Sequence, residues 1–541
     1  MLSSLAFGVL TLSSAINAEP VVFEPTGQWQ GNDGPWSTFN VQVGEPAQTI
    51  AVLPVPYRNA LVVVGPEACP TDPQFASCGQ DRGGTYNRTA SSTWQNVDSM
   101  KWDPTESVVL PPTRKNSANG NNMVQPGSTA PNGPVSMHKF GYDQIKGLPG
   151  KNGTASWQVP NQGILSLTGM YPFIGMMGLG TKFSGTSKNP TSFFDNVRIA
   201  NNLKSVSWSY TAGSNRRRSD QAPGSLVFGG HDASRFHPNT AIKCAMHAGQ
   251  RPLGIEVGDI TVNDPLQPGP QTIQLSSRFI ADIDFTTPFI TLPEQVTSGL
   301  ERMLDLTWDA ANSFYRVNET RHRELLDSKT NITLPIFGDG GKKYEFRIQY
   351  KHLVLEAKFP TVNTPTKFFA VQRAPQTQAI FTLGRAFLQV AHVTAVFDDP
   401  AGPYISVAKA KYKKNVPRQI VEIVTTKEPT SHAGMIAGIV IAILVLLAIA
   451  GYLIFAKKMR RFPFRAAPAP KRRIGNEEDG KNFSSFSTSA PSHSAPRSPP
   501  RPVLGNSRQS QRSAESVYYE AMEPASKHSL DHKHSLQDMK R

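Results

Sequence analysis

Cysteine is scarce in this chain, which has only three cysteines among 541 residues. Three cysteines exclude a disulfide-dense small scaffold and a four-cysteine zinc site. Charged residues make up 18% and apolar residues 38%, so a globular part must coexist with long polar stretches. The net charge is +15, but residues 457–541 alone contain 17 basic and 8 acidic residues. A basic tail, rather than a basic domain, argues against a nucleic-acid partner.

Long apolar runs are also rare, and the chain has one that could span a membrane. Residues 433–456 contain no charged side chain, and a helix of this length can cross the hydrocarbon core. Basic residues follow at once, which predicts that this end is cytoplasmic. Residues 1–18 are apolar and Ser-rich and end in a small-residue pattern, so they are predicted to be a signal peptide, although a basic start is lacking.

These features predict type I topology in the plasma membrane or a secretory-pathway membrane, with the N-terminus extracellular or lumenal. Residues 416–432 are then a juxtamembrane stalk, and residues 457–541 are a disordered, basic, Ser/Pro-rich cytoplasmic tail. An adaptor or a kinase is the expected partner of such a tail. Four Asn-x-Thr sequons predict that the outer part is a glycoprotein: Asn87, Asn152, Asn318 and Asn331.

The residues before the stalk predict a mainly β structure. Short β-branched and aromatic runs lie between turn signals, for example at residues 39–43, 225–228 and 393–397. Only residues 190–202 and 294–306 have apolar residues at helical spacing.

Four segments, in order, resemble motifs of the pepsin-like aspartic peptidases. They are Gly44–Gln48, Gly175–Gly180, Ser225–Asp232, and Leu383–Leu388 followed by Val396–Asp398. Together they cover nearly the whole outer part. The resemblance implies an all-β bilobal fold, with an N-terminal lobe at residues 19–205, a C-terminal lobe at residues 206–415 and a cleft between them. It implies no metal and no cofactor.

In that family each lobe supplies one Asp from an Asp-Thr/Ser-Gly loop, and the two carboxylates share a proton and activate water. This chain contains neither Asp-Thr-Gly nor Asp-Ser-Gly. Counting from Gln48, and independently back from Leu61, the first Asp position falls on Val55, and the loop glycine is replaced by Tyr57. Valine cannot hold a proton, so half of the pair is predicted to be missing.

The second loop keeps Asp284, nine residues before Pro293 as in the family, but Phe285 and Thr286 follow it. Asp284 is either a surviving catalytic acid or, as we favour, a structural relic that is protonated in an apolar cleft. Asp282 is out of register and is expected to be a bystander, without being excluded. The predicted cleft-lining residues are Val55, Tyr57, Asp282, Phe285 and Thr286.

Two further features follow from the resemblance. The family often has a small loop disulfide where Cys69 and Cys78 lie, so these are expected to be paired. Cys244 is left over, either as a buried free thiol, which we favour, or for an intermolecular bridge. The Gly-x-Gly flap of the family is missing before Gly175.

Three functions remain possible at this stage. The chain is a catalytically inactive surface protein that binds a peptide or cell-wall polymer, an active membrane-anchored aspartic endopeptidase that uses Asp284, or a structural surface glycoprotein. Loss of the first Asp favours the inactive binding or sensor protein. The combination of one span, this fold and a long tail resembles the membrane-anchored peptidase-like proteins of filamentous fungi.

Overall fold

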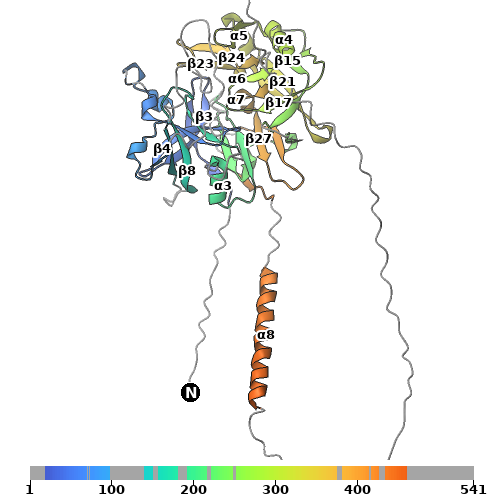
Figure 1. The fold of residues 1–541 in the computed structure, drawn as a ribbon. Coiled ribbons are helices and arrows are strands. Elements are labelled where there is room, and N and C mark those ends of the chain that lie inside the picture. Colours follow the sequence, from blue (N-terminus) through green and yellow to red (C-terminus); the bar gives the residue numbers. More distant parts are fainter. Residues whose placement is uncertain are drawn as a thin grey trace, which may run out of the picture. The chain divides into compact units, whose positions relative to one another are not determined.

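A computed structural model describes residues 19–69, 71, 73–97, 139–149, 156–180, 192–215, 221–247, 251–374, 380–412, 416–425 and 433–459. The predicted signal peptide, the sequon at Asn152, the last part of the predicted stalk and nearly all of the predicted tail lie outside these residues. The described part is mostly β, as the sequence predicts (Figure 1).

The first lobe is built on an eight-stranded sheet. Its order is β2 (Pro25–Gln30), β3 (Trp36–Val43), β4 (Gln48–Val55), β9 (Gly175–Gly178), β5 (Leu61–Val64), β8 (Gln158–Leu167), β7 (Lys139–Lys146) and β6 (Gln95–Asn96). In β3, Phe39, Val41 and Val43 are buried and the residues between them are partly exposed. This alternation is typical of a strand with one face in the core. The predicted helix at residues 190–202 is the shorter α3 (Phe193–Ala200).

The second lobe contains a nine-stranded sheet. Its path is β16 (Gln271–Ile273), β15 (Ile260–Asn263), β21 (Asn331–Phe337), β14 (Gly254–Val257), β17 (Phe279–Ile283), β26 (Phe381–Leu383), β18 (Ile290–Leu292) and β25 (Val371–Arg373), with β22 (Lys343–Gln349) beside β21. A four-stranded sheet follows the order β19 (Leu306–Asp309), β20 (Phe314–Val317), β24 (Thr366–Phe369) and β23 (Val354–Ala357).

Helices accompany the sheets of the second lobe: α4 (Glu294–Leu304), α5 (Glu319–Asp327), α6 (Tyr350–Leu353) and α7 (Arg385–Leu388). In α4, Val296, Leu300 and Leu304 are buried at four-residue spacing, as the sequence predicts. The helix ends at Asp305, which adopts a left-handed conformation.

A six-stranded sheet joins the two lobes. Its order is β1 (Val21–Phe23), β11 (Ser225–Phe228), β10 (Ser207–Thr211), β27 (Ala391–Val396), β28 (Tyr404–Lys409) and β13 (Ile242–Ala245). The predicted lobe boundary at residues 205/206 falls just before β10. Trp208 and Phe228 are fully buried on this sheet, so the lobes share a continuous core.

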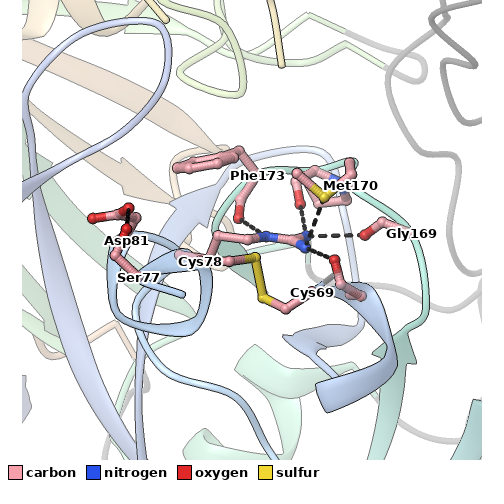
Figure 2. Close-up of a disulfide and its surroundings, with 10 residues drawn as sticks. Cys69, Ser77, Cys78, Asp81, Gly169, Met170 and Phe173 are labelled. Atoms are coloured by element: carbon pink, nitrogen blue, oxygen red, sulfur yellow. Dashed lines mark hydrogen bonds between the residues drawn. A yellow bond between two sulfur atoms is a disulfide. The ribbon is translucent and has the colours of Figure 1, made fainter. Parts of the chain in front are cut away.

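The predicted disulfide is present, with Cys69 bonded to Cys78 at the start of α1 (Cys78–Asp81). The adjacent Arg82 is fully buried and makes no ion pair in the described part of the chain. Instead its guanidinium donates to the four carbonyl oxygens of Ala68, Gly169, Pro172 and Phe173 and to the sulfur of Met170. Figure 2 shows how these groups converge beside the disulfide and hold the two loops together.

The segment predicted to be a stalk begins as folded structure. Strand β29 (Ile420–Glu422) pairs with β12 (Gly230–Asp232). Gln419 donates its N–H to the Asp232 carboxylate at 3.0 Å, and Ile423 donates to the Gly229 carbonyl at 2.9 Å. Residues 416–425 therefore belong to the folded unit, and the prediction of a stalk starting at residue 416 is wrong for them. Four of the five residues at 420–424 are β-branched, which is typical of a strand, but the partner strand β12 lies far away in the sequence.

Helix α8 (Ala433–Met459) contains the predicted span. Residues Val440–Lys458 are long and apolar enough to cross a membrane. No polar stripe runs along this helix, which is typical of a segment surrounded by lipid.

The predictions for the sequons and for Cys244 can be compared with the burial of these residues. Asn87 and Asn318 are exposed and cap short helices, so they can present a glycan. Asn331 is only 7% exposed inside β21 between β15 and β22, which makes it unsuitable as a glycan carrier. Cys244 is a buried free thiol that contacts the Phe337 carbonyl at 3.6 Å, as we favoured.

Candidate functional site

The two lobes repeat one arrangement of three strands. In the first lobe, β4 runs parallel to β9, and β5 runs antiparallel to β9. In the second lobe, β17 runs parallel to β26, and β18 runs antiparallel to β26. The loops that leave β4 and β17 therefore have equivalent surroundings.

A glycine fixes each of these loops in the same way. Gly178 donates its N–H to the Ala60 carbonyl at 3.1 Å, and Gly384 donates to the Phe289 carbonyl at 2.9 Å. A Cβ atom on either glycine would lie 2.4 Å from a loop carbonyl oxygen. Only glycine permits this close approach, so the two hydrogen bonds define matching points in the two loops.

Val55 and Asp284 occupy equivalent positions by this symmetry. Val55 lies five residues before Ala60, and Asp284 lies five residues before Phe289. The internal symmetry thus leads to the same register that the sequence predicts. Val55 is 1% exposed. It is packed in a small apolar cluster with Ala60, Val62, Val64, Ala68, Phe140, Leu165, Leu167 and Met176.

On the second-lobe side of the site, Arg251 contacts both Asp282 and Asp284, and no sequence pattern predicts it. Arg251 donates from Nη2 to Asp284 Oδ2 at 3.2 Å and from Nη1 to Asp282 Oδ2 at 3.0 Å. The other oxygen of Asp284 accepts from the Thr286 N–H at 3.1 Å. The two carboxylate side chains are each 13% exposed. The expectation of an apolar surrounding for Asp284 is therefore wrong, because its carboxylate is held in an ion pair.

Burial and the neighbouring charges shift the pKa values of this cluster. Burial and the nearby Asp284 carboxylate raise the pKa of Asp282, although Arg251 opposes the shift. Burial lowers the pKa of Arg251, but the charges of Asp284 and Asp282 outweigh it and raise that pKa overall. Asp282 is thus coupled directly to Asp284 through a shared cation, and is not a remote bystander.

The first lobe closes over this cluster with Tyr57 and Arg58. The Arg251 guanidinium lies 5.2 Å from the centre of the Tyr57 ring, a cation–π contact between the lobes. Burial, together with the carboxylates of Asp282 and Asp284, raises the pKa of Tyr57. Burial lowers the pKa of the partly buried Arg58 to about 10, and the charges of Asp284 and Arg251 act on it as well.

Phe285 does not line a cleft. It is fully buried, with its ring 4.5 Å from that of Tyr210 and 5.7 Å from that of Trp208. The prediction that it lines the cleft is wrong, because the aromatic core under β10 takes up its ring. Thr286 is half-buried and contributes backbone groups to the loop.

A second arginine holds the loop from behind. Arg385 donates from Nη1 to the carbonyls of Phe285 and Thr286 at 3.0 and 2.8 Å. From Nη2 it pairs with Asp33 of the first lobe at 2.5 Å. Arg385 stands where the resembled motif has an aspartate, so the charge at this position is reversed and the lobes are tied together at the loop.

Neither Arg251 nor Arg58 belongs to a motif. Arg58 could have been found from its place three residues after Val55, whereas Arg251 lies 31 residues before Asp282 and only the fold brings them together. Within the described ranges, no group of three or more His, Cys, Asp or Glu side chains is arranged to hold a metal ion.

Two cavities lie away from these loops. One of about 660 Å³ lies between β2, the disulfide loop and residues 358–365, and is lined in part by Trp29, Phe75 and Phe359. Another of about 410 Å³ is lined by β22 and the end of β28. Neither cavity includes Val55 or Asp284 in its lining.

Residues 157–410 match the family model described as eukaryotic aspartyl protease. No curated protein matches the chain.

Proposed function

Since the chain belongs, over residues 157–410, to the pepsin-like aspartic peptidase family, we propose that it is a membrane-anchored, catalytically inactive member that binds a ligand between its lobes. The single observation that carries the proposal is the pair of equivalent positions, which hold Val55 in one lobe and Asp284 in the other.

Hydrolysis in this family needs two facing carboxylates that share one proton, because one must act as base while the other acts as acid. Valine can do neither. Loss of one member of a catalytic unit removes most of its rate enhancement, since the members do not act additively. The described side chains that form the cluster around Val55 are apolar and offer no hydrogen bond to a water.

The ion pair of Arg251 is a second obstacle to catalysis. A general base must offer a free lone pair to the water that it deprotonates. Arg251 and the Thr286 N–H each use one lone pair of the Asp284 carboxylate, which leaves fewer lone pairs for a water.

The anchor and the tail complete the proposal. Helix α8 fixes the folded part to a membrane, and the positive charge that follows it supports type I orientation. Glycans on Asn87 and Asn318 and cytoplasmic partners on the tail would make the protein a surface sensor or scaffold. The same features suit a structural glycoprotein, in which the interlobe site has no ligand.

The alternative activity has one observation in its favour. Asp282 and Asp284 lie side by side on Arg251, and the pKa of Asp282 is raised, as for the acid of a carboxylate pair. Both carboxylates come from the second lobe, however, and face the same cation.

The test is peptide hydrolysis by the full-length protein in detergent, with a randomised peptide library from acid to neutral pH and products read by mass spectrometry. We expect no cleavage. A trace of an authentic pepsin-type peptidase in the same detergent is the positive control. Cleavage that disappears in Asp284→Asn would overturn the proposal and establish the Asp282–Asp284 alternative.

A further inference from the structure

The loop of the first lobe has gained a positive charge as well as losing a negative one. By the symmetry of the two glycines, Val55 corresponds to Asp284, and Arg58 corresponds to Thr287. The backbone carbonyls of Arg58 and Thr287 confirm this equivalence, since each lies 2.4 Å from the Cβ position of its glycine. The first loop is therefore more positive than the second by two charges, one from Val55 in place of an aspartate and one from Arg58 in place of a threonine.

These changes alter the net charge of the site. Two facing aspartates give the family site a negative charge. Here Asp282 and Asp284 are balanced by Arg251 and Arg58, so the formal sum is zero. A ligand carboxylate that approaches the site no longer meets a net repulsion.

Among the described residues, Arg58 is the charged member of this cluster that makes no side-chain hydrogen bond, and the neighbouring Tyr57 hydroxyl is buried without a partner as well. Asp282, Asp284 and Arg251 are hydrogen-bonded to one another. Across the described residues, no acceptor or carboxylate lies within hydrogen-bonding or ion-pairing distance of the Arg58 guanidinium. Its side chain is partly buried, yet it still reaches solvent. The Asp284 charge acts on Arg58 without a hydrogen bond, so its partly desolvated donors are unpaired, and a bound carboxylate would pair with them.

We propose that Arg58 is an anion-binding residue of the interlobe site and that the ligand is an acidic peptide whose carboxylate it pairs with. The inference rests on the proposed function, namely a cleft that binds peptide without cutting it. A planar guanidinium matches a carboxylate with two parallel hydrogen bonds, which a neutral peptide cannot offer. Arg251 contributes by neutralising part of the charge of the two aspartates that would repel such a ligand.

The test uses the full-length protein in nanodiscs of zwitterionic lipid and three immobilised-protein retention assays. The first probe is a peptide library with blocked ends in which a central Glu is the only charged residue. The second is the same library with Gln in place of Glu, and the third is the Gln library with a free C-terminal carboxylate. Mass spectrometry of the retained peptides gives the preference. We expect the central-Glu library to be retained at least about tenfold better than the Gln library, the size of one charged hydrogen bond.

Arg58→Gln should abolish this preference, and Arg58→Lys should keep part of it. The matched control is Arg88→Gln, which removes an arginine paired with Glu67 elsewhere on the first lobe and should leave the preference unchanged. The melting temperature shows whether Arg58→Gln folds. If it does not fold, Arg58→Lys is compared instead, and the inference is overturned if this variant prefers the Glu library over the Gln library as strongly as the unaltered protein does.

The outcomes separate the two proposals. Equal retention of the Glu and Gln libraries overturns the role of Arg58 but leaves a peptide-binding cleft standing. Retention of neither library overturns the peptide-binding function and the inference with it. A preference for the free C-terminus over the central Glu, lost in Arg58→Gln, identifies a terminal carboxylate as the anion.

Discussion

At the scale of single residues, Arg251 decides the chemistry of the site. It joins Asp282 and Asp284 and stacks on Tyr57 of the other lobe. Asp284 is therefore part of an ion cluster of three side chains, with Arg251 between the two carboxylates. This explains how two carboxylates that are each 13% exposed can stay close together in a site whose first lobe holds Val55 at the equivalent position.

The raised pKa of Asp282 predicts a definite dependence of stability on pH. The folded state holds the Asp282 proton more tightly than the unfolded state, so stability falls as pH rises from the ordinary Asp value of about 3.9 through the folded pKa. Asp282→Asn removes this titration. Its free energy of unfolding, relative to the unaltered protein, should therefore increase across that range and level off above it, as measured by urea unfolding of the full-length protein in detergent.

The control for this prediction is Glu345→Gln, which removes an exposed carboxylate of a surface pair. Its curve should run parallel to that of the unaltered protein. A parallel curve for Asp282→Asn would contradict the prediction and mean that Arg251 dominates the titration of Asp282.

At the scale of elements, β29 connects the folded part to the span. It lies beyond residues 157–410, which match the family model. Its backbone hydrogen bonds to β12 and Gly229 hold this segment against the folded part. Only seven residues separate Thr425 from the start of α8. The tether between the folded part and the membrane helix is therefore short.

Ile423→Pro removes the N–H that bonds to Gly229 and should release this strand. We expect trypsin to cleave after Arg418 several-fold faster, with the melting temperature of the folded part nearly unchanged. Val424→Pro is the matched control, because Val424 is 55% exposed. Equal cleavage rates in the two proline variants would show that β29 does not protect the segment.

At the scale of the whole molecule, the pair of Arg385 and Asp33 ties the lobes together behind the second loop. Arg385→Met leaves two loop carbonyls without their donor and removes the cation paired with Asp33, which among the described residues then keeps only the Trp36 Nε1–H bond at 2.7 Å. It should lower the free energy of unfolding by about 3–5 kcal/mol, as for one member of a buried pair. Asp33→Asn should cost less, because its amide oxygen can still accept from Arg385.

The measurement is a double-mutant cycle by urea unfolding. The two substitutions together should cost less than the sum of the single ones, since they remove one shared interaction. Arg88→Met, which breaks an exposed pair, should cost no more than about 1 kcal/mol. Strict additivity of Arg385→Met and Asp33→Asn would contradict the idea of a clamp between the lobes.

Much of this protein was determined by the sequence alone, because the information is local. Apolar alternation predicts the strands, an uncharged run predicts α8, and the spacing from Gln48 and Leu61 identifies Val55 as the residue at the first aspartate position. The Cys69–Cys78 bridge followed from the family resemblance.

Only the tertiary structure decided which charges meet. Arg251 and Arg385 are far along the chain from Asp284 and Asp33, and no periodicity links them. The burial of Phe285 and Asn331 and the pairing of β29 likewise depend on neighbours from distant segments. Ion pairs form wherever the fold brings side chains within a few ångström of one another. A local sequence pattern therefore predicts the strands that support the site but does not predict the long-range ion pairs within it.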